Sequence, residues 1–155
     1  MSDRPTFHYR GQPVRAAGIL LWTIHNGQVF RLFRKVNGKF EDIGGKTDKV
    51  DVDAVATAIR ETVEETDGKL FSPQHTRQQC AEILDGLFQD VTEYNQRSKY
   101  LLFKIKVDSS ILDLSMKRFG LSEETEWGTL KHYYQWRLEL PHYNQLHFRL
   151  RGLRL

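Results

Sequence analysis

The sequence predicts a single α/β domain, because segments with the pattern of strands alternate along the chain with segments of helical period. Residues 14–24 form a long apolar and β-branched run, residues 51–66 carry apolar side chains at helical spacing, and residues 99–107 place apolar side chains at every second position. At 155 residues, the chain is long enough to bury a hydrophobic core but short for two domains. We therefore expect residues 1–155 to form one domain.

The composition indicates a globular protein. Hydrophobic residues make up 39% of the chain and charged residues 28%, a balance far from that of disordered proteins. No apolar run approaches the roughly 20 residues that a bilayer-spanning helix needs, and the N-terminal residues are too polar for a signal peptide. We expect a soluble, cytoplasmic protein without a membrane partner.

Cysteine content and charge narrow the classes of function. Cys80 is the only cysteine, which excludes an intramolecular disulfide and a cysteine-based zinc site. The net charge of +3 is mild, but basic side chains dominate the last part of the chain. If these side chains share one face, that face would favour binding of a polyanionic substrate or RNA. The alternative is that they lie on a solvated helix face. The basic residues are Lys131, Arg137, Arg149, Arg151 and Arg154.

The first elements are predicted to be strands joined by tight turns. Residues 14–24 end at Asn26-Gly27, a pair that tolerates the positive φ of a hairpin turn, and residues 29–36 should form the returning strand. Asn37-Gly38 repeats the turn signal. Residues 39–43 then form a short extended piece that delivers the chain to Gly44-Gly45.

The first helix is predicted over residues 51–66. Asp51 or Asp53 can cap its N-terminus, and Gly68 can take the left-handed conformation that ends a helix. Its apolar side chains recur at steps of three and four, on a stripe expected to face the core. The stripe consists of Val52, Val55, Ile59 and Val63.

The remaining elements follow the same alternation. A second amphipathic helix is predicted over residues 76–88, a half-buried strand over 99–107 and another extended segment over 127–134. Pro141 suits the first turn of a helix, and leucines recur after it at helical spacing. We expect a C-terminal helix to lie on the domain.

Three carboxylates on the first helix are the strongest candidates for chemistry. Glu61 stands one turn from Glu64 and Glu65 on the same face of the helix. Like charges so close together destabilise an isolated helix, and a divalent cation would reverse that effect. An oxygen-only site suits Mg²⁺ or Mn²⁺ better than zinc. The alternative is an ordinary solvated acidic face.

The double glycine before this helix adds a second element to the candidate site. Gly44-Gly45 permits a sharp loop and a close approach of main chain to a ligand. Backbone carbonyl groups there can contribute to metal coordination. Loop and helix together form a plausible cradle for phosphate and metal.

The segment GGKTDKVDVDAVATAIRETVEETDG resembles the signature of the Nudix hydrolase family, G-x5-E-x7-R-E-U-x-E-E-x-G-U, with U an aliphatic residue. The double glycine, Arg60-Glu61 and Glu64-Glu65 match, over about 25 residues of the chain. The loop between the glycines and Arg60 is one residue longer than the pattern. Its early glutamate therefore has no counterpart in register, and Asp51 or Asp53 is the nearest acid.

Other departures from the Nudix pattern are local. Thr62 stands at an aliphatic position, and Asp67 stands at the glycine position with Gly68 following it. Phe40 and Asp42-Ile43 replace the Trp and Leu-Pro that often precede the double glycine in the family, so stacking of substrate there is not predicted.

The resemblance implies an α/β/α sandwich with a mixed sheet and hydrolysis of a diphosphate linked to another moiety. It implies that Glu61, Glu64, Glu65 and a carbonyl of Gly44 or Gly45 bind Mg²⁺ or Mn²⁺, and that Arg60 orients the carboxylates. Glu61 is the first choice for the base that deprotonates the attacking water. Many relatives draw this base or a further ligand from a later loop, where the acids here are Glu123, Glu124 and Glu126.

The resemblance leaves the substrate open among nucleoside triphosphates, dinucleoside polyphosphates, nucleotide sugars or dinucleotides, inositol pyrophosphates and capped RNA. Arg34, Lys39 and Lys46 are candidates to hold phosphates, with solvated surface positions as the alternative. The aromatic residues at 133–137 could stack on bases or belong to the core. The rival functions are a catalytically silent Nudix-like module that binds nucleotide and an RNA-binding domain on the same scaffold.

Overall fold

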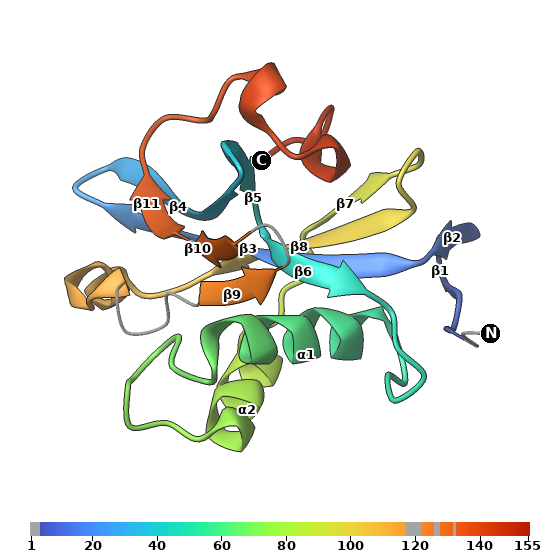
Figure 1. Cartoon of the computed structure of the whole chain (residues 1–155), viewed down its shortest axis with the longest axis horizontal. Coiled ribbons are helices and arrows are strands. Elements are labelled where there is room, and N and C mark those ends of the chain that lie inside the picture. Colours follow the sequence, from blue (N-terminus) through green and yellow to red (C-terminus); the bar gives the residue numbers. More distant parts are fainter. Residues whose placement is uncertain (1–3, 117–121, 126–127, 132) are drawn as a thin grey trace.

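The computed structural model describes residues 4–116, 122–125, 128–131 and 133–155 (Figure 1). The β-strands and helices follow one another in an α/β order. They are β1 (Phe7–Tyr9), β2 (Gln12–Val14), β3 (Ala16–His25), β4 (Gln28–Val36), β5 (Lys39–Glu41), β6 (Ile43–Lys46), α1 (Ala54–Thr66), α2 (Arg77–Leu87), β7 (Thr92–Asn95), β8 (Tyr100–Lys106), the 3₁₀ helix η1 (Ser109–Asp113), β9 (Ser122–Thr125), β10 (Gly128–Lys131), β11 (Tyr133–Arg137), and the 3₁₀ helices η3 (Tyr143–Gln145) and η4 (Phe148–Leu150).

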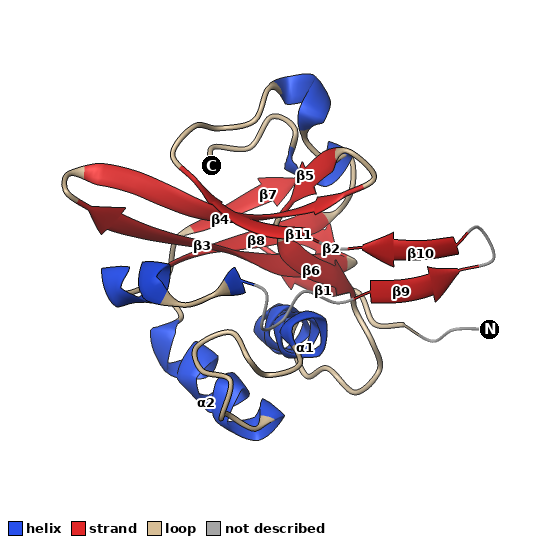
Figure 2. Cartoon of the chain, turned by 60° about the vertical axis from the view of Figure 1, so that its left-hand side comes forward, coloured by secondary structure: helices blue, strands red, loops and turns tan. Residues whose placement is uncertain are grey.

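A seven-stranded mixed sheet forms the centre of the fold, which confirms the predicted α/β class (Figure 2). Its strand order is β11-β4-β3-β8-β7, with β5 paired to β4 and β6 paired to β3. Strand β8 runs parallel to β3, and the other pairs are antiparallel. Strands β6 and β4 both pair with β3, β6 with its first part and β4 with its last part. This arrangement brings the double glycine of β6 directly beside the first residues of β3.

The Asn-Gly turns are formed as predicted. Asn26 and Gly27 have φ values of 52° and 74°, and Asn37 and Gly38 have values of 50° and 76°. Asparagine and glycine tolerate this left-handed region better than other residues do. The N-terminal hairpin β1–β2 was not predicted, because strands of three residues are too short to show an alternating pattern.

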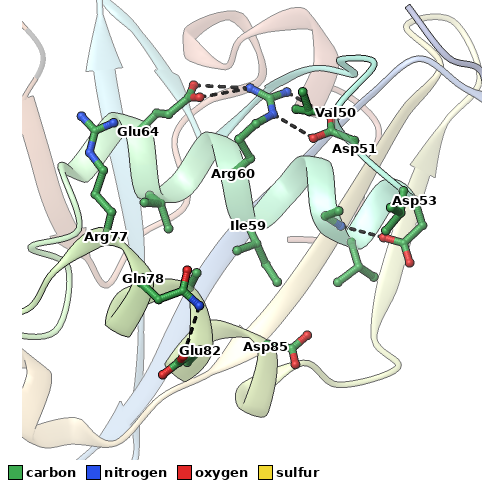
Figure 3. A pocket seen from close by; sticks show the side chains of 15 residues that line it. Val50, Asp51, Asp53, Ile59, Arg60, Glu64, Arg77, Gln78, Glu82 and Asp85 are labelled. Atoms are coloured by element: carbon green, nitrogen blue, oxygen red, sulfur yellow. Dashed lines mark hydrogen bonds and ion pairs between the residues drawn. The ribbon is translucent and has the colours of Figure 1, made fainter.

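Helix α1 presents small side chains to the sheet, so the predicted core stripe is wrong in part. Its buried residues are Ala54, Thr57, Ala58, Thr62, Val63 and Thr66. Of the predicted stripe, Val63 is buried, while Val52 precedes the helix and is 84% exposed. Val55 and Ile59 are partly buried and line a groove between α1 and α2 (Figure 3). Close packing of α1 on β6 and β3 leaves room only for alanine and threonine on the sheet side.

The buried threonines of α1 satisfy their hydroxyl groups within the helix. Thr62 Oγ1 donates to the carbonyl of Ala58 and Thr66 Oγ1 to the carbonyl of Thr62, each at 2.8 Å. A buried hydroxyl without a partner destabilises a fold, and a bond to the carbonyl four residues earlier removes that penalty. Thr62, which departs from the aliphatic pattern, therefore fits a dry interface without cost in hydrogen bonds.

The ends of α1 resolve two alternatives that the sequence left open. Asp53 is the N-cap and accepts a hydrogen bond from the backbone N of Ala56 at 2.8 Å. Asp67 is the C-cap with a φ of 51°, and Gly68 follows it with a φ of 72°. Both residues are left-handed, so the shifted Asp-Gly pair closes the helix as a glycine would.

Helix α2 and strand β8 agree with the prediction in type and place, whereas β7 and β9 were not predicted. Helix α2 begins after Thr76, which forms a capping box with Gln79, and Cys80 on this helix is fully buried. Strand β8 is buried on both faces over Tyr100–Phe103, more deeply than a half-buried strand. Strand β10 lies within the predicted extended segment 127–134, and β11 begins there but continues to Arg137, while Trp127 lies outside the described residues. Among the described residues, no helix combines the length and apolar character needed to span a membrane.

The C-terminal segment covers the opposite face of the sheet (Figure 1), but the predicted α-helix is absent from it. Two 3₁₀ turns, η3 and η4, are separated by Leu146, which is extended and forms a β-bridge with Phe40. The backbone N of His147 also donates to the carbonyl of Phe40 at 2.8 Å. This pairing with β5 competes with helical hydrogen bonds, while Leu146 and Leu150 still fill the core as their spacing indicated.

Glycine at position 44 is a requirement of this packing, and its replacement is the first prediction. A Cβ at Gly44 would lie 2.5 Å from the Cα of Gly18 and 2.6 Å from the carbonyl oxygen of Ala17, two backbone atoms that cannot move aside. We expect Gly44→Ala to lower the free energy of unfolding by about 3 kcal/mol or more.

Gly86→Ala is the matched control, because Gly86 lies in α2 and an added Cβ there meets no atom within 4 Å. Alanine should raise helix stability there by up to about 1 kcal/mol. Urea unfolding of both variants measures the difference. Equal stabilities of the two variants would contradict the close approach of β6 to β3.

Candidate functional site

Gly45 and Glu61 are in direct contact where α1 crosses β6. A Cβ at Gly45 would lie 2.5 Å from the carboxyl carbon of Glu61 and within 2.7 Å of both carboxyl oxygens. No larger residue than glycine can therefore occupy position 45 while Glu61 keeps this place. The contact brings a carboxylate beside the main chain of β6. The sharp loop predicted at Gly44-Gly45 is wrong, because both glycines pair with β3 as part of this strand, and the cradle is formed by strand and helix.

Arg60 ties the loop to the acidic face of the helix (Figure 3). Its Nε lies 2.8 Å from Oδ1 of Asp51, and its Nη2 donates to the carbonyl of Lys46 at 2.9 Å. Its Nη1 lies 3.2 Å from Glu61 Oε1 and 3.3 Å from Glu64 Oε2. One guanidinium thus fixes the end of β6, the loop and two glutamates relative to each other, which supports the orienting role predicted for Arg60.

Asp51 is the acid that the longer loop supplies to Arg60. Its carboxylate is 2% exposed and also accepts hydrogen bonds of 2.8 Å from Thr57 Oγ1 and from the backbone N of Asp48. Burial alone would raise the pKa of Asp51, but the hydrogen bonds from Arg60, Thr57 and Asp48 outweigh it and hold the pKa below its usual value. The extra loop residue therefore divides two tasks between two aspartates, with Asp53 capping the helix and Asp51 pairing with Arg60.

Glu65 faces the sheet rather than Arg60. Its Oε2 lies 2.9 Å from Nη1 of Arg34, which also lies 3.5 Å from Oε1 of Glu41. Strand β11 holds the same turn of the helix, since Tyr134 Oη donates to the backbone carbonyl of Glu65 at 2.9 Å. The cross-strand pair of Arg34 on β4 and Glu41 on β5 thus positions Glu65 from the side of the sheet.

Glu41 is a buried acid of the site that the sequence reasoning missed. It is 8% exposed, and its burial raises its pKa, with Arg149 and Arg34 opposing that shift. Its place in the short strand before the double glycine puts it on the same face as Arg34, a relation that only the register of β4 and β5 reveals. The one signal in the sequence was the position of this acid between Phe40 and Asp42, in the short extended segment before the double glycine.

Burial also raises the pKa of Glu61, an effect that Arg60 opposes and that Glu64 and Glu65 reinforce. Desolvation disfavours the charged form of a carboxyl group, and neighbouring negative charges add to the penalty. Burial is thus the main cause of the raised pKa of Glu61, and the two neighbouring glutamates add to it.

The three glutamates fit a divalent cation by their chemistry, although their present contacts are with arginines. Carboxylate oxygens and a main-chain carbonyl are the ligands that Mg²⁺ and Mn²⁺ prefer, and the glycine cradle at position 45 admits Glu61. Within the described part of the chain, no three His, Cys, Asp or Glu side chains converge closely enough to hold a metal ion. Metal binding would therefore draw the carboxylates from Arg60 and Arg34 toward a common point.

The other predicted site residues lie in different settings. The amine of Lys39 donates to the carbonyl of Asn144 at 2.5 Å, and Arg34 is held by Glu65 and Glu41, so both are engaged in protein contacts. Lys46 is exposed at the end of β6, beside the carbonyl that Arg60 binds. Of the later acids, Glu123 and Glu124 belong to strand β9, and Glu126 lies outside the described residues.

A second buried charge cluster supports the double glycine from the other face. Arg149 Nη2 lies 2.8 Å from Oδ1 of Asp42, whose side chain is fully buried, and the hydroxyl of Tyr100 donates to the second carboxyl oxygen. Burial raises the pKa of Tyr100 well above its usual value. Arg149, which the basic tail suggested as a surface cation, is instead the counter-ion of Asp42.

The pairing of Asp51 with Arg60 generates the second prediction. We expect Asp51→Asn to lower the free energy of unfolding at pH 7 by about 2 kcal/mol, because a hydrogen-bonded charge pair of low exposure is lost. A depressed pKa stabilises the fold above the ordinary aspartate value of 3.8, and the contribution is lost as pH falls through the lower pKa of the folded state. The gap between wild type and variant should therefore close below about pH 3.8.

Asp53→Asn is the matched control, since asparagine caps a helix about as well as aspartate. It should change stability at pH 7 by less than about 0.5 kcal/mol. Chemical denaturation between pH 3 and 8 separates the two variants. A larger loss in Asp53→Asn than in Asp51→Asn would show that the arginine pair is not the stabilising contact.

Neither a protein-family model nor a curated protein matches this sequence significantly. Solved structures similar to the chain include two of Ap4A hydrolases. A crystal structure of a C. elegans Ap4A hydrolase has 19% identity, covers 79% of this chain and 78% of its own, and gives a TM-score of 0.44. A C. elegans Ap4A hydrolase binary complex has 20% identity, covers 62% of this chain and 67% of its own, and gives a TM-score of 0.39. Similarity at this level assigns neither a family nor an activity, so the function has to be argued from the residues themselves.

Proposed function

We propose that the protein is a Mg²⁺- or Mn²⁺-dependent Nudix-type hydrolase of phosphoric anhydrides. The observation that carries the proposal is the contact of the Glu61 carboxylate with Gly45, beside an arginine that also engages Glu64 and the carbonyl of Lys46. An ordinary solvated acidic face needs neither a glycine under one glutamate nor a guanidinium joining it to the preceding loop. The substrate class is a nucleotide or another polyphosphorylated small molecule, or capped RNA.

In this proposal, the residues of the chain divide the work. Glu61, Glu64 and Glu65 hold the cation together with the carbonyl of Gly45, and the bound cation supplies positive charge to the phosphate oxygens and acidifies the attacking water. Glu61 accepts the proton of that water, because it lies deepest against the main chain. Glu123, Glu124 or Glu126 is the alternative base.

Two groups of cationic side chains support this arrangement. Arg60 and Arg34 position the carboxylates, since each already bridges two acids across different elements. Lys46 is the best placed cation to receive a substrate phosphate, because it is exposed at the end of β6, directly after the double glycine. Lys39 and Arg34 would have to exchange protein contacts for phosphate contacts.

The rival reading is a catalytically silent module that binds nucleotide or RNA. One observation favours it: all three glutamates have arginine partners at 2.9 to 3.3 Å. A protein that never binds metal would neutralise its acidic face in this manner. The two readings differ in what Mg²⁺ does to the folded protein, so they can be separated without knowing the substrate.

The third prediction concerns metal binding in the absence of substrate. A cation that binds only the folded state stabilises it by about 1.4 kcal/mol at ten times its dissociation constant, a rise in Tm of roughly 3–6 °C for a chain of this size. We expect Mg²⁺ or Mn²⁺ to raise the Tm of the wild type and to leave that of Glu65→Gln unchanged. Exposed Glu82 on α2 provides the control, since Glu82→Gln should keep the full response.

The fourth prediction concerns turnover. A screen of nucleoside triphosphates, dinucleoside polyphosphates, nucleotide sugars, inositol pyrophosphates and capped RNA with Mg²⁺ or Mn²⁺ should identify at least one substrate class. Glu61→Gln should lower kcat/KM by about 10²–10⁴-fold, the range of general acid–base contributions. Glu82→Gln should retain activity. Metal stabilisation without hydrolysis of any class beyond the Glu61→Gln level would favour the silent module.

A further inference from the structure

A second pocket lies on the face of the sheet opposite α1, between the turn after β7 and the C-terminal segment. It has a volume of about 540 Å³ and is lined by Tyr94, Asn95, Arg97, Tyr143, Phe148 and Arg151, together with Gln96, Gly152 and Leu153. No acidic residue is among these lining residues. A cavity of this size accommodates a small organic ligand, and its lining combines aromatic rings with positive charge only.

Two aromatic rings at this pocket are unusually open to solvent. Tyr143 is 63% exposed and Phe148 is 60% exposed. The ring of His147 lies 4.6 Å from that of Phe148 at an angle of 31°, and the guanidinium of Arg151 lies 5.2 Å from the ring of Tyr143. Each aromatic ring is thus supported by a neighbour while most of its surface stays free. Such rings are platforms on which a planar ligand can stack.

Two arginines provide the charge of the pocket. Among the described contacts, neither Arg97 nor Arg151 has an acidic partner. Arg151 donates from its Nε to the carbonyl of Leu146 at 3.1 Å, and its guanidinium lies over the ring of Tyr143. Arg34, Arg60 and Arg149 differ in this respect, because each is paired with a carboxylate. The terminal amines of Arg151 and the whole guanidinium of Arg97 are therefore available to an anionic ligand.

The side chain of Asn95 holds the two halves of the pocket together. Its amide donates to the carbonyls of Phe148 at 3.3 Å and Arg149 at 2.9 Å, and its oxygen accepts from the backbone N of Arg97 at 3.0 Å and Ser98 at 3.2 Å. Asn95 is 8% exposed, so these hydrogen bonds are shielded from water. The position of the arginine turn relative to the aromatic segment is therefore fixed before any ligand arrives, which lowers the entropy lost on binding.

We propose that this pocket binds a nucleotide, with the base stacked on Phe148 and the phosphate held by Arg97 and Arg151. An aromatic platform alone would suit many planar ligands, and an arginine pair alone would suit any anion. Their combination in one acid-free cavity fits a ligand that joins a planar base to a phosphate. The site is separate from the glutamates of α1 and does not require that the chain be a hydrolase.

The test measures binding of a fluorescein-labelled octaadenylate RNA to the full chain by fluorescence anisotropy, in EDTA so that no cation occupies the glutamates. Arg97→Gln combined with Arg151→Gln should weaken binding and lower the slope of log K against log salt by about 1.4, because two phosphate contacts are lost. Phe148→Ala should weaken binding roughly tenfold without changing that slope, because it removes stacking alone.

Lys106→Gln is the matched charge control, since Lys106 is exposed at the other end of β8. It should leave the affinity within about twofold of wild type, as expected for a cation that touches no phosphate. Binding that is absent, or that Lys106→Gln weakens as much as the pocket variants do, would overturn the proposal. A loss of affinity in the arginine variant but not in Phe148→Ala would also overturn it, because the site would then recognise charge without a base.

Competition with AMP and with inorganic phosphate identifies the source of the nucleotide. Displacement of the RNA by AMP but not by equal phosphate supports a site for free nucleotides. Failure of AMP to compete, with the variant pattern intact, supports a nucleotide within a strand that continues past the pocket. Displacement by phosphate as strong as that by AMP contradicts the proposal. Because EDTA is present throughout, none of these results depends on the Mg²⁺ response of Glu65.

Discussion

The close approach of helix α1 to strand β6 is the constraint on which the candidate site depends. Glycine at positions 44 and 45 lets the strand lie against β3 on one side and against Glu61 on the other. The sheet side of the helix carries mainly alanine and threonine, and the threonine hydroxyls form hydrogen bonds within the helix. A larger side chain at any of these places would lift the helix and move its glutamates away from the loop. The geometry of the acids is therefore set by packing before any electrostatic interaction acts on it.

Electrostatics then decides how the acidic face is kept stable. Like charges one turn apart repel each other, and burial of Glu61 adds a desolvation penalty that raises its pKa. Arg60 opposes the shift at Glu61 from the side of the loop, and Arg34 pairs with Glu65 from the side of the sheet. Both arginines are themselves fixed by a further acid, Asp51 or Glu41, so neither depends on the glutamates for its place. The three glutamates of α1 can thus move to another partner while Arg60 and Arg34 each keep a carboxylate beside them.

The sequence predicted the framework well where the signal was local. Asn-Gly turns, the cap residues of α1, the alternation in β8 and the spacing of the three glutamates are written within a few neighbouring residues. It failed where long-range pairing decided the outcome. The leucines after Pro141 keep helical spacing, but the bridge from Leu146 to Phe40 draws the backbone into extended conformation. Val52 and Ile59 were predicted as core residues, yet Val52 is exposed before the start of α1 and Ile59 is only partly buried, in the groove between α1 and α2. The partnership of Arg34 with Glu41 likewise depends on strand register, which no single segment encodes.

The α1 site and the second pocket use arginine in opposite ways, and this contrast bears on what each of them can bind. Beside α1 and beneath the double glycine, Arg34, Arg60 and Arg149 each pair with a buried or half-buried carboxylate, so a ligand there must first exchange partners. In the second pocket, Arg97 from the turn after β7 and Arg151 from the C-terminal segment have no carboxylate partner among the described contacts, and no acidic residue lines the pocket. An exchange of partners favours a multivalent ligand such as a cation with a polyphosphate, which can satisfy acids and arginines together. Unpaired arginines favour a weaker, salt-sensitive encounter with a singly charged phosphate. Paired arginines at the α1 site therefore favour selectivity among ligands, and the unpaired arginines of the second pocket favour capture of an anion.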